Sequence, residues 1–280
     1  MNEYKYRELD LAERIYRCGF QSNRLSSELR LLALYLKTVL GFRPRQVKNM
    51  LEEFLQKQMP DYAPEKYYPL INRALRQTAP KDSRLIQIEE IPVWQEELDY
   101  IRKVPLTAEE GVILAEDYNC RKLLFAFLVE MRLVQTACRL ESLPFYFKGD
   151  KKRYAELQKT AKIPESVSLH ETLIHHLNQA GLVQILFGGM IRLCFLEELE
   201  HNSKPAYQRA PALRIRNLTA YGWYFDYANS RPRIRLCSAC SQPFRPRTNR
   251  QIYCCEECAK DAGREAGRIR IRRYRERKAA

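Results

Sequence analysis

Five cysteines near the C-terminus have the spacing of a metal site. Cys237 and Cys240 form a C-x-x-C pair, and thirteen residues separate this pair from a second group that holds Cys254, Cys255 and Cys258. Thiolates at this spacing are typical of structural zinc, which binds four protein ligands tetrahedrally. A segment with so little apolar sequence needs such a metal in order to fold. We therefore predict that these cysteines bind Zn²⁺.

The spacing alone leaves the choice of ligands open. Cys254 and Cys258 are four residues apart, Cys255 and Cys258 are three apart, and both spacings place two thiols on one face of a helix start. The alternative to a metal site is a set of free or catalytic cysteines. A redox C-x-x-C pair would need a thioredoxin-like βαβ context, which the surrounding sequence lacks. Metal binding by four of the five cysteines is therefore favoured.

Arginine dominates the same C-terminal segment. Residues 231–280 carry fifteen Lys and Arg against five Asp and Glu, so +10 of the formal net charge of +14 lies there. Four zinc-bound thiolates and the metal would lower the total to about +12. Guanidinium groups bind phosphate through paired hydrogen bonds, so we expect these residues to contact nucleic acid. The candidates are Arg245, Arg247, Arg250, Arg264, Arg268, Arg270, Arg272, Arg273, Arg275 and Arg277.

The alternative for this tail is a solvated basic segment, or one that binds an acidic protein. The sign and density of the charge favour nucleic acid. Tyr274 is the only aromatic residue among the arginines of 264–278, so stacking on single-stranded bases is not specially favoured. Gly263, Gly267 and like-charge repulsion weaken a helix here. We therefore expect a tail that is partly disordered until it binds.

The second cysteine group resembles part of a known zinc-finger family. Its sequence, Tyr253-Cys254-Cys255-Glu256-Glu257-Cys258, is similar to the Tyr-Cys-Ser-x-x-Cys segment of treble-clef fingers, including the CGNR-type fingers of bacterial and phage proteins. The resemblance runs from Arg235 to the C-terminus, although the CGNR sequence itself is absent. In that family the residue after the first cysteine caps the helix and does not bind metal.

This resemblance implies a specific ligand set. Cys237, Cys240, Cys254 and Cys258 would bind Zn²⁺, and Cys255 would cap the helix. Phe244 fits the aromatic residue often found after the first cysteine pair and should pack under the site. The resemblance also implies a DNA-binding protein of a phage or mobile element, acting as a regulator or accessory factor.

The sequence offers no pattern of a catalytic site. A treble-clef nuclease of the His-metal type would need a histidine among the cysteines, but His170, His175, His176 and His201 all lie elsewhere. We find no nucleophile–base pair and no phosphate-cradling glycine loop. The protein is therefore not expected to be an enzyme.

The elements that position this finger are expected to be mainly helical. The apolar periodicity predicts helices over 26–39, 45–59, from 64 onward, 94–104 and 122–139. The first three should form a small bundle, with Ser26 or Ser27 as a cap. A short strand is expected at 85–88, a polar linker at 201–212 and an aromatic helix at 217–228 that docks the finger.

Residues 122–197 have an order of elements of their own. The long helix is followed by a strand at 145–147, helices at 151–160 and 168–180, and strands over 182–187 and 190–196. Gly181 should end the second of these helices, and Gly188-Gly189 predicts a hairpin turn. The order resembles a winged-helix domain.

In such a domain the helix at 168–180 would face DNA. Its outward residues are Thr172, His175, His176, Asn178 and Gln179. Asn and Gln side chains can bind adenine, but the helix has no Arg or Lys. Phosphate attraction would have to come from Lys148, Lys151, Lys152, Arg153, Lys159 and Lys162. The alternative is a winged helix that contacts protein. Consecutive histidines face about 100° apart, so the pair is expected to be polar surface, not a metal site.

We thus predict a mainly α protein in four parts. These are a helical domain (1–83), a winged-helix-like α+β domain (84–200), a linker with a docking helix (201–233) and a zinc finger with its basic tail (234–280).

The expected setting is the cytoplasm, without a membrane partner. The nine cysteines are odd in number, no signal peptide is visible, and no apolar run reaches the length of a membrane span. DNA is favoured as the partner. The alternative is an RNA- or ribonucleoprotein-binding adaptor whose helical body contacts protein.

Overall fold

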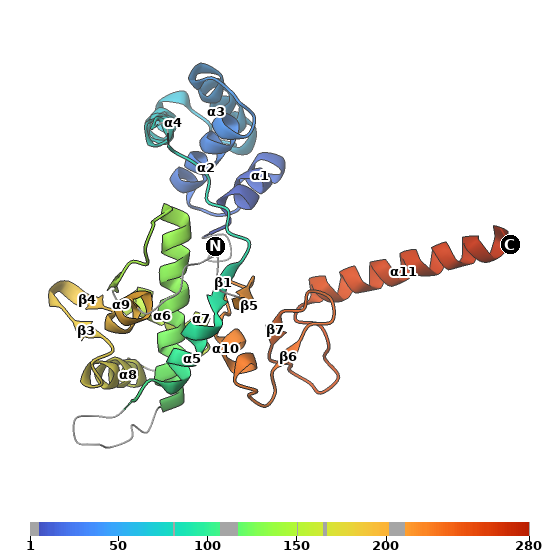
Figure 1. Ribbon diagram of the computed structural model, residues 1–280. Helices are drawn as coiled ribbons and strands as arrows, with labels where there is room; N and C mark the ends of the chain where they lie inside the picture. Colours follow the sequence, from blue (N-terminus) through green and yellow to red (C-terminus); the bar gives the residue numbers. More distant parts are fainter. Residues whose placement is uncertain are drawn as a thin grey trace. The chain divides into compact units, whose positions relative to one another are not determined.

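A computed structural model describes residues 6–80, 82–106, 117–149, 151–164, 167–201 and 211–279. In these ranges the chain forms eleven α-helices and seven short strands, which pair in three small antiparallel sheets (Figure 1). The predicted mainly α class is therefore confirmed. None of the helices in the described ranges is both long and apolar enough to cross a membrane. The chain divides into two compact units, Met1–Glu89 with Thr136–Cys138, and Glu90–Gln135 with Arg139–Ala280.

The first unit is a bundle of four helices. They are α1 (Glu8–Cys18), α2 (Leu25–Thr38), α3 (Pro44–Gln58) and α4 (Pro64–Thr78). Pro44 and Pro64 stand at the first helical position, where a missing N–H has no consequence. The apolar stripe of α2 is buried against Ile15, Leu51 and Ile71 of the other helices.

Two predictions in this unit are wrong. Ser26 and Ser27 lie inside α2 and do not cap it, because the helix begins at Leu25. Residues 85–88 form no strand but a single bridge, between Gln87 and Arg7. Pairing cannot extend further because Arg7 is followed at once by α1, a helix that the sequence did not predict.

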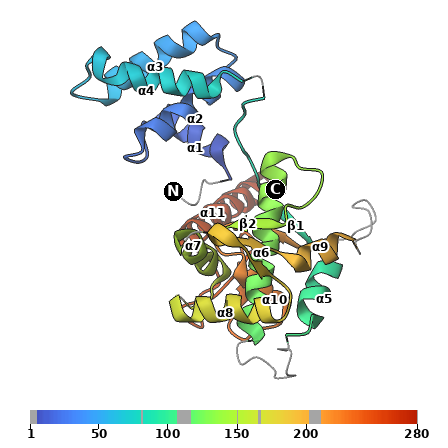
Figure 2. The ribbon, with the colours of Figure 1, turned by 90° about the vertical axis from the view of Figure 1, so that its left-hand side faces the viewer.

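The second unit surrounds α6 (Asp117–Cys138), whose residues from Leu123 to Val129 are completely buried. The helices near it in this unit are α5 (Gln95–Lys103), α7 (Lys151–Ala161), α8 (Val167–Gln179), α9 (Cys194–His201) and α10 (Gly222–Ala228) (Figure 2). A helix that is apolar on all sides must be enclosed on all sides, which is why α6 is central.

A three-stranded sheet covers part of this unit. Its strands are β2 (Tyr146–Lys148), β3 (Gln184–Ile185) and β4 (Met190–Arg192), in the order β2-β4-β3. The predicted order of helix, strand, two helices and hairpin is present from α6 to β4. The hairpin is shorter than predicted, because Cys194 begins α9. Phe195 and Leu199 lie four residues apart and are buried on one helical face, a spacing that a strand would not satisfy.

Two further strands pair just before the cysteine-containing segment. β1 (Ile91–Trp94) pairs with β5 (Pro211–Ile215), with Ile91 opposite Ile215. The predicted linker therefore ends before Pro211, and its residues 202–210 lie outside the described ranges. The predicted aromatic helix is also shorter, since α10 begins only at Gly222. Asn217 accepts hydrogen bonds from the N–H and hydroxyl of Thr219 and so stabilises a turn there.

Candidate metal centre and its basic surroundings

The first cysteine pair lies in a tight turn between two short strands. β6 (Arg235–Leu236) and β7 (Pro243–Phe244) pair as a hairpin, and Cys237 and Cys240 lie in the connection. Ser241 closes this turn in the left-handed region, with φ 57°. Its N–H donates to the carbonyl of Cys237 at 2.8 Å. The turn thus aims two thiols to one side.

The second cysteine group returns beside this turn in irregular backbone. Ile252 and Tyr253 have no strand conformation. Instead, the carbonyl of Ile252 accepts the N–H of Ser238 at 3.0 Å. The N–H of Cys254 then donates to the sulfur of Cys237 at 3.3 Å. These two bonds bring the cysteine groups together.

Four sulfur atoms form one cluster. The Sγ atoms of Cys237, Cys240, Cys254 and Cys258 all lie within 4.8 Å of one another. Cys254 Sγ is 3.6 Å from Cys240 Sγ and 3.5 Å from Cys258 Sγ. A tetrahedral zinc with Zn–S bonds of about 2.3 Å separates its sulfurs by about 3.8 Å. The cluster therefore has the size and donor set to hold a metal ion such as zinc.

Cys255 lies next to the cluster and makes a different contact. It precedes α11 (Glu256–Ala279), and its sulfur accepts the N–H of Cys258 at 3.5 Å. That N–H is the third of the helix, the one that an N-cap side chain satisfies. Cys255 is therefore in the capping position that the family resemblance implied, and Cys254 is in the cluster.

The thiols differ in how easily they ionise. Burial disfavours the thiolate of Cys237 and by itself would raise its pKa. Hydrogen bonds from the backbone N–H groups of Cys240, Cys254 and Ala239 outweigh burial and lower the pKa of Cys237 to about 6. Burial and the neighbouring thiols raise the pKa of Cys254, and burial raises the pKa of Cys258 to about 12. Without a cation, the thiolate thus forms more readily at Cys237 than at Cys254 or Cys258. A divalent ion stabilises the thiolate form of every ligand.

α10 fixes the finger to the rest of its unit. The Lys122 ammonium of α6 lies 2.6 Å from a carboxylate oxygen of Asp226, and both side chains are buried. The Tyr118 hydroxyl donates to the other oxygen of Asp226 at 2.6 Å. Burial lowers the pKa of Lys122, and the hydrogen bond to Asp226 offsets part of this effect. Phe225 packs on Phe125, with ring centroids 5.1 Å apart. Phe244, predicted to pack under the metal site, is buried on β7.

The C-terminal tail differs from its prediction, because α11 is one continuous helix. Ion pairs along it join Arg264 to Asp261, Arg268 to Glu265 and Arg272 to Glu276. Pairs at these spacings support a helix and offset the like-charge repulsion. Arg264, Arg268, Arg270, Arg272 and Arg273 are exposed, as are Arg245, Arg247 and Arg250 of the preceding loop. The side chains of Arg275 and Arg277 lie outside those that the structure describes.

The outward face of α8 is only partly available for contact. Thr172, His175, Asn178 and Gln179 are exposed, and His176 is half-buried. The side-chain oxygen of Asn178 accepts the N–H of Ile185, so this residue already serves to join α8 to β3. Two of the predicted basic neighbours are engaged as well. Arg153 lies over the ring of Phe147, and Lys162 lies over that of Trp223.

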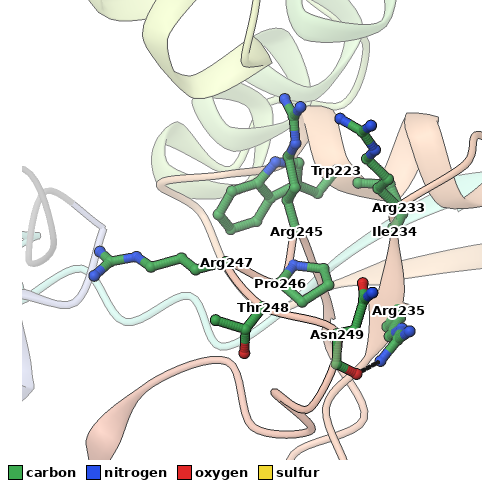
Figure 3. Close-up of a pocket in the computed structure, with 9 residues that line it drawn as sticks. All are labelled: Trp223, Arg233, Ile234, Arg235, Arg245, Pro246, Arg247, Thr248 and Asn249. Carbon is green, nitrogen blue, oxygen red and sulfur yellow. Dashed lines mark hydrogen bonds between the residues drawn. The ribbon is translucent and has the colours of Figure 1, made fainter.

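The structure also gathers basic residues that were not among the predicted nucleic-acid contacts. Arg233 and Arg235 line a cleft together with Arg245, Arg247 and the indole of Trp223 (Figure 3). The alternation of arginine at 231, 233 and 235 just before the first cysteine was a visible signal. No local pattern places Trp223 there, because it reaches the cleft through the packing of α10 against β7.

Compared with protein-family models, with curated proteins and with solved structures, the chain matches none of them. Its function is therefore inferred from the site itself.

Proposed function

We propose that the protein is a zinc-dependent nucleic-acid-binding protein, and that duplex DNA is its main partner. One observation carries the proposal. A four-cysteine cluster with sulfur–sulfur distances suited to zinc lies at the N-terminus of α11, an exposed helix with arginines on successive turns. The metal would fix the helix start and the adjoining loop, so that guanidinium groups meet phosphates from a rigid base.

The form of α11 favours DNA over duplex RNA. A helix of 24 residues is roughly 36 Å long and 10–12 Å wide. The major groove of B-DNA, about 12 Å wide, admits a helix, whereas that of A-form RNA is deep and too narrow. An RNA- or ribonucleoprotein-binding adaptor is the alternative.

Two finer assignments support this proposal. A hairpin turn with two cysteines and a second pair at a helix start resembles the arrangement of a treble-clef finger. The order of elements from α6 to β4, with strand order β2-β4-β3, resembles that of a winged helix. Asn178 is already bonded to the N–H of Ile185, and α8 carries no Arg or Lys, so we assign this domain to protein contact or to backbone contact, not to base reading. The role as a regulator or accessory factor of a phage or mobile element follows only from the finger resemblance. No catalytic role is proposed.

The test is the salt dependence of binding by the zinc-loaded protein. If about five phosphates are neutralised, log affinity for a labelled duplex should fall with log salt at a slope near −4 to −5. Arg270→Gln and Arg273→Gln should each reduce the slope by about 1, because neither guanidinium has an ion-pair partner among the described residues. Arg73→Gln, on the exposed surface of α4, is the charge-matched control and should leave the slope unchanged. A flat salt response would contradict the proposal.

A further inference from the structure

A cleft of ≈ 840 Å³ opens beside the metal centre (Figure 3). Its volume is within the range of small-molecule pockets, about 300–1,000 Å³. Trp223 of α10 forms part of the wall, with Arg233, Arg235, Arg245 and Arg247 around it. None of the described lining residues is acidic. A cleft of this composition is suited to an anion that also has an apolar face.

The arginines that line the cleft form no ion pair with any acidic residue that the structure describes. Arg235 donates to the carbonyl of Asn249 at 2.7 Å and so holds the loop after β7 in place. Arg233, Arg245 and Arg247 make no ion pair within the part of the chain that the structure describes, and all three are exposed. Phosphate suits such unpaired arginines, because it accepts hydrogen bonds from several guanidinium groups at once.

Trp223 supplies the flat surface. Its indole is half-buried, so its orientation is held by the protein. The Lys162 ammonium lies 4.8 Å from the ring centroid and fixes it further. A rigid aromatic ring beside cationic groups is the combination on which single-stranded nucleic acid binds, with the base stacked on the ring and the backbone on the cations.

We infer that this cleft binds one unpaired nucleotide, with its base stacked on Trp223 and its phosphates on Arg233, Arg245 and Arg247. The inference rests on the proposed function and adds to it a preference for a duplex that carries a single-stranded end or gap. A paired base cannot use the site, since its neighbours in the duplex cover both of its faces. The tail arginines bind phosphate without this discrimination.

Fluorescence gives a direct test. The chain has two tryptophans, so Trp94→Phe leaves Trp223 as the only one. Oligothymidylate should then quench the tryptophan emission as it binds. An oligonucleotide with an abasic residue at each position keeps the phosphates but has no base to stack, so it should bind without quenching. Binding of oligothymidylate with unchanged emission would overturn the inference.

Affinity gives the second test, on zinc-loaded full-length protein. Trp223→Ala should weaken binding to a duplex with a thymidine overhang by about 5- to 150-fold, the range of base–aromatic stacking, and leave binding to the blunt duplex unchanged. Trp223→Phe keeps an aromatic ring, so its affinity for the overhang duplex should fall less than that of Trp223→Ala. It replaces the alanine variant in this test if that variant does not fold. Arg233→Gln should weaken binding to the thymidine and abasic overhangs alike.

The outcomes separate the two proposals. Equal losses on blunt and overhang duplexes, or no loss on either, overturn the nucleotide cleft and leave the duplex-binding function standing. Absence of salt-dependent binding to every nucleic acid would overturn the proposed function and the cleft together.

Discussion

Four thiols within 4.8 Å of one another cannot all ionise unless a cation lies among them. Only Cys237 has a lowered pKa among the three clustered thiols whose shifts are described, while burial and neighbouring sulfur raise those of Cys254 and Cys258. A metal ion held by this cluster, such as the proposed zinc, would therefore displace protons on binding, and acid should weaken that binding. At the residue scale, the ligand set is the first property to test.

Cys258→Ala should lose the metal, whereas Cys255→Ser should retain it. Cys258 Sγ belongs to the cluster, and its removal leaves three ligands. Cys255 instead accepts a helix N–H, which a serine hydroxyl can also accept. Atomic emission on protein purified without chelators gives the zinc content, expected near one per chain in the serine variant. Full zinc in Cys258→Ala, or its loss in Cys255→Ser, would show that Cys255 is the ligand.

The cysteines could be predicted from the sequence because their constraint is local. A turn between two cysteines and a helix start after two more need only nearby residues. The choice of Cys254 over Cys255 came from the resemblance, not from spacing. The cleft could not be predicted in the same way. Trp223 lies 14 residues before Cys237 in the sequence, and its place beside Arg245 depends on tertiary packing.

At the scale of elements, α10 positions the finger by a very close approach to α7. A Cβ at Gly222 would lie 1.9 Å from the carbonyl oxygen of Ala161, which is backbone and cannot move aside like a flexible side chain. Gly267 in α11 has no atom within 4 Å of the corresponding position. The same substitution should therefore have opposite effects at the two sites.

Gly222→Ala should destabilise the second unit by about 1–3 kcal/mol, the usual effect of overpacking. Gly267→Ala should stabilise α11 by about 1 kcal/mol, because alanine has the higher helix propensity. Urea unfolding gives the first value, and helical circular dichroism of the zinc-loaded protein gives the second. A Gly222→Ala variant as stable as the parent would mean that α10 does not pack this closely on α7.

Long helices were predicted better than short elements. The apolar period of α2, α3 and α4 extends over many residues, so the boundaries predicted for them are correct to within about one residue, whereas α6 begins at Asp117, before its predicted start at 122. Residues 85–88 and 194–196 have apolar sequence that suits strands, but a strand also needs a partner of equal length. α1 begins too early to supply one, and α9 buries Phe195 as a helix. In α11, ion pairs between nearby turns outweighed two glycines.

At the scale of the whole molecule, charge and stability are concentrated in different places. Residues 231–280 hold +10 of the net charge, whereas the buried apolar side chains lie mostly before them. The cysteine-containing segment has little apolar core of its own, so it must be anchored to the core formed by the preceding helices. The buried pair of Lys122 and Asp226 is the polar part of this anchor.

Asp226→Asn should lower the stability of the second unit by about 3–5 kcal/mol, because it leaves the Lys122 ammonium buried without a counter-charge. Asp261→Asn is the matched control, since it removes the same charge from an exposed pair with Arg264 and should change stability little. Urea unfolding in the Trp94→Phe background follows Trp223, which lies on the same helix as Asp226. If the two asparagine variants unfold at the same urea concentration, the buried pair does not anchor α10, and apolar packing around Phe225 alone must hold the finger to its unit.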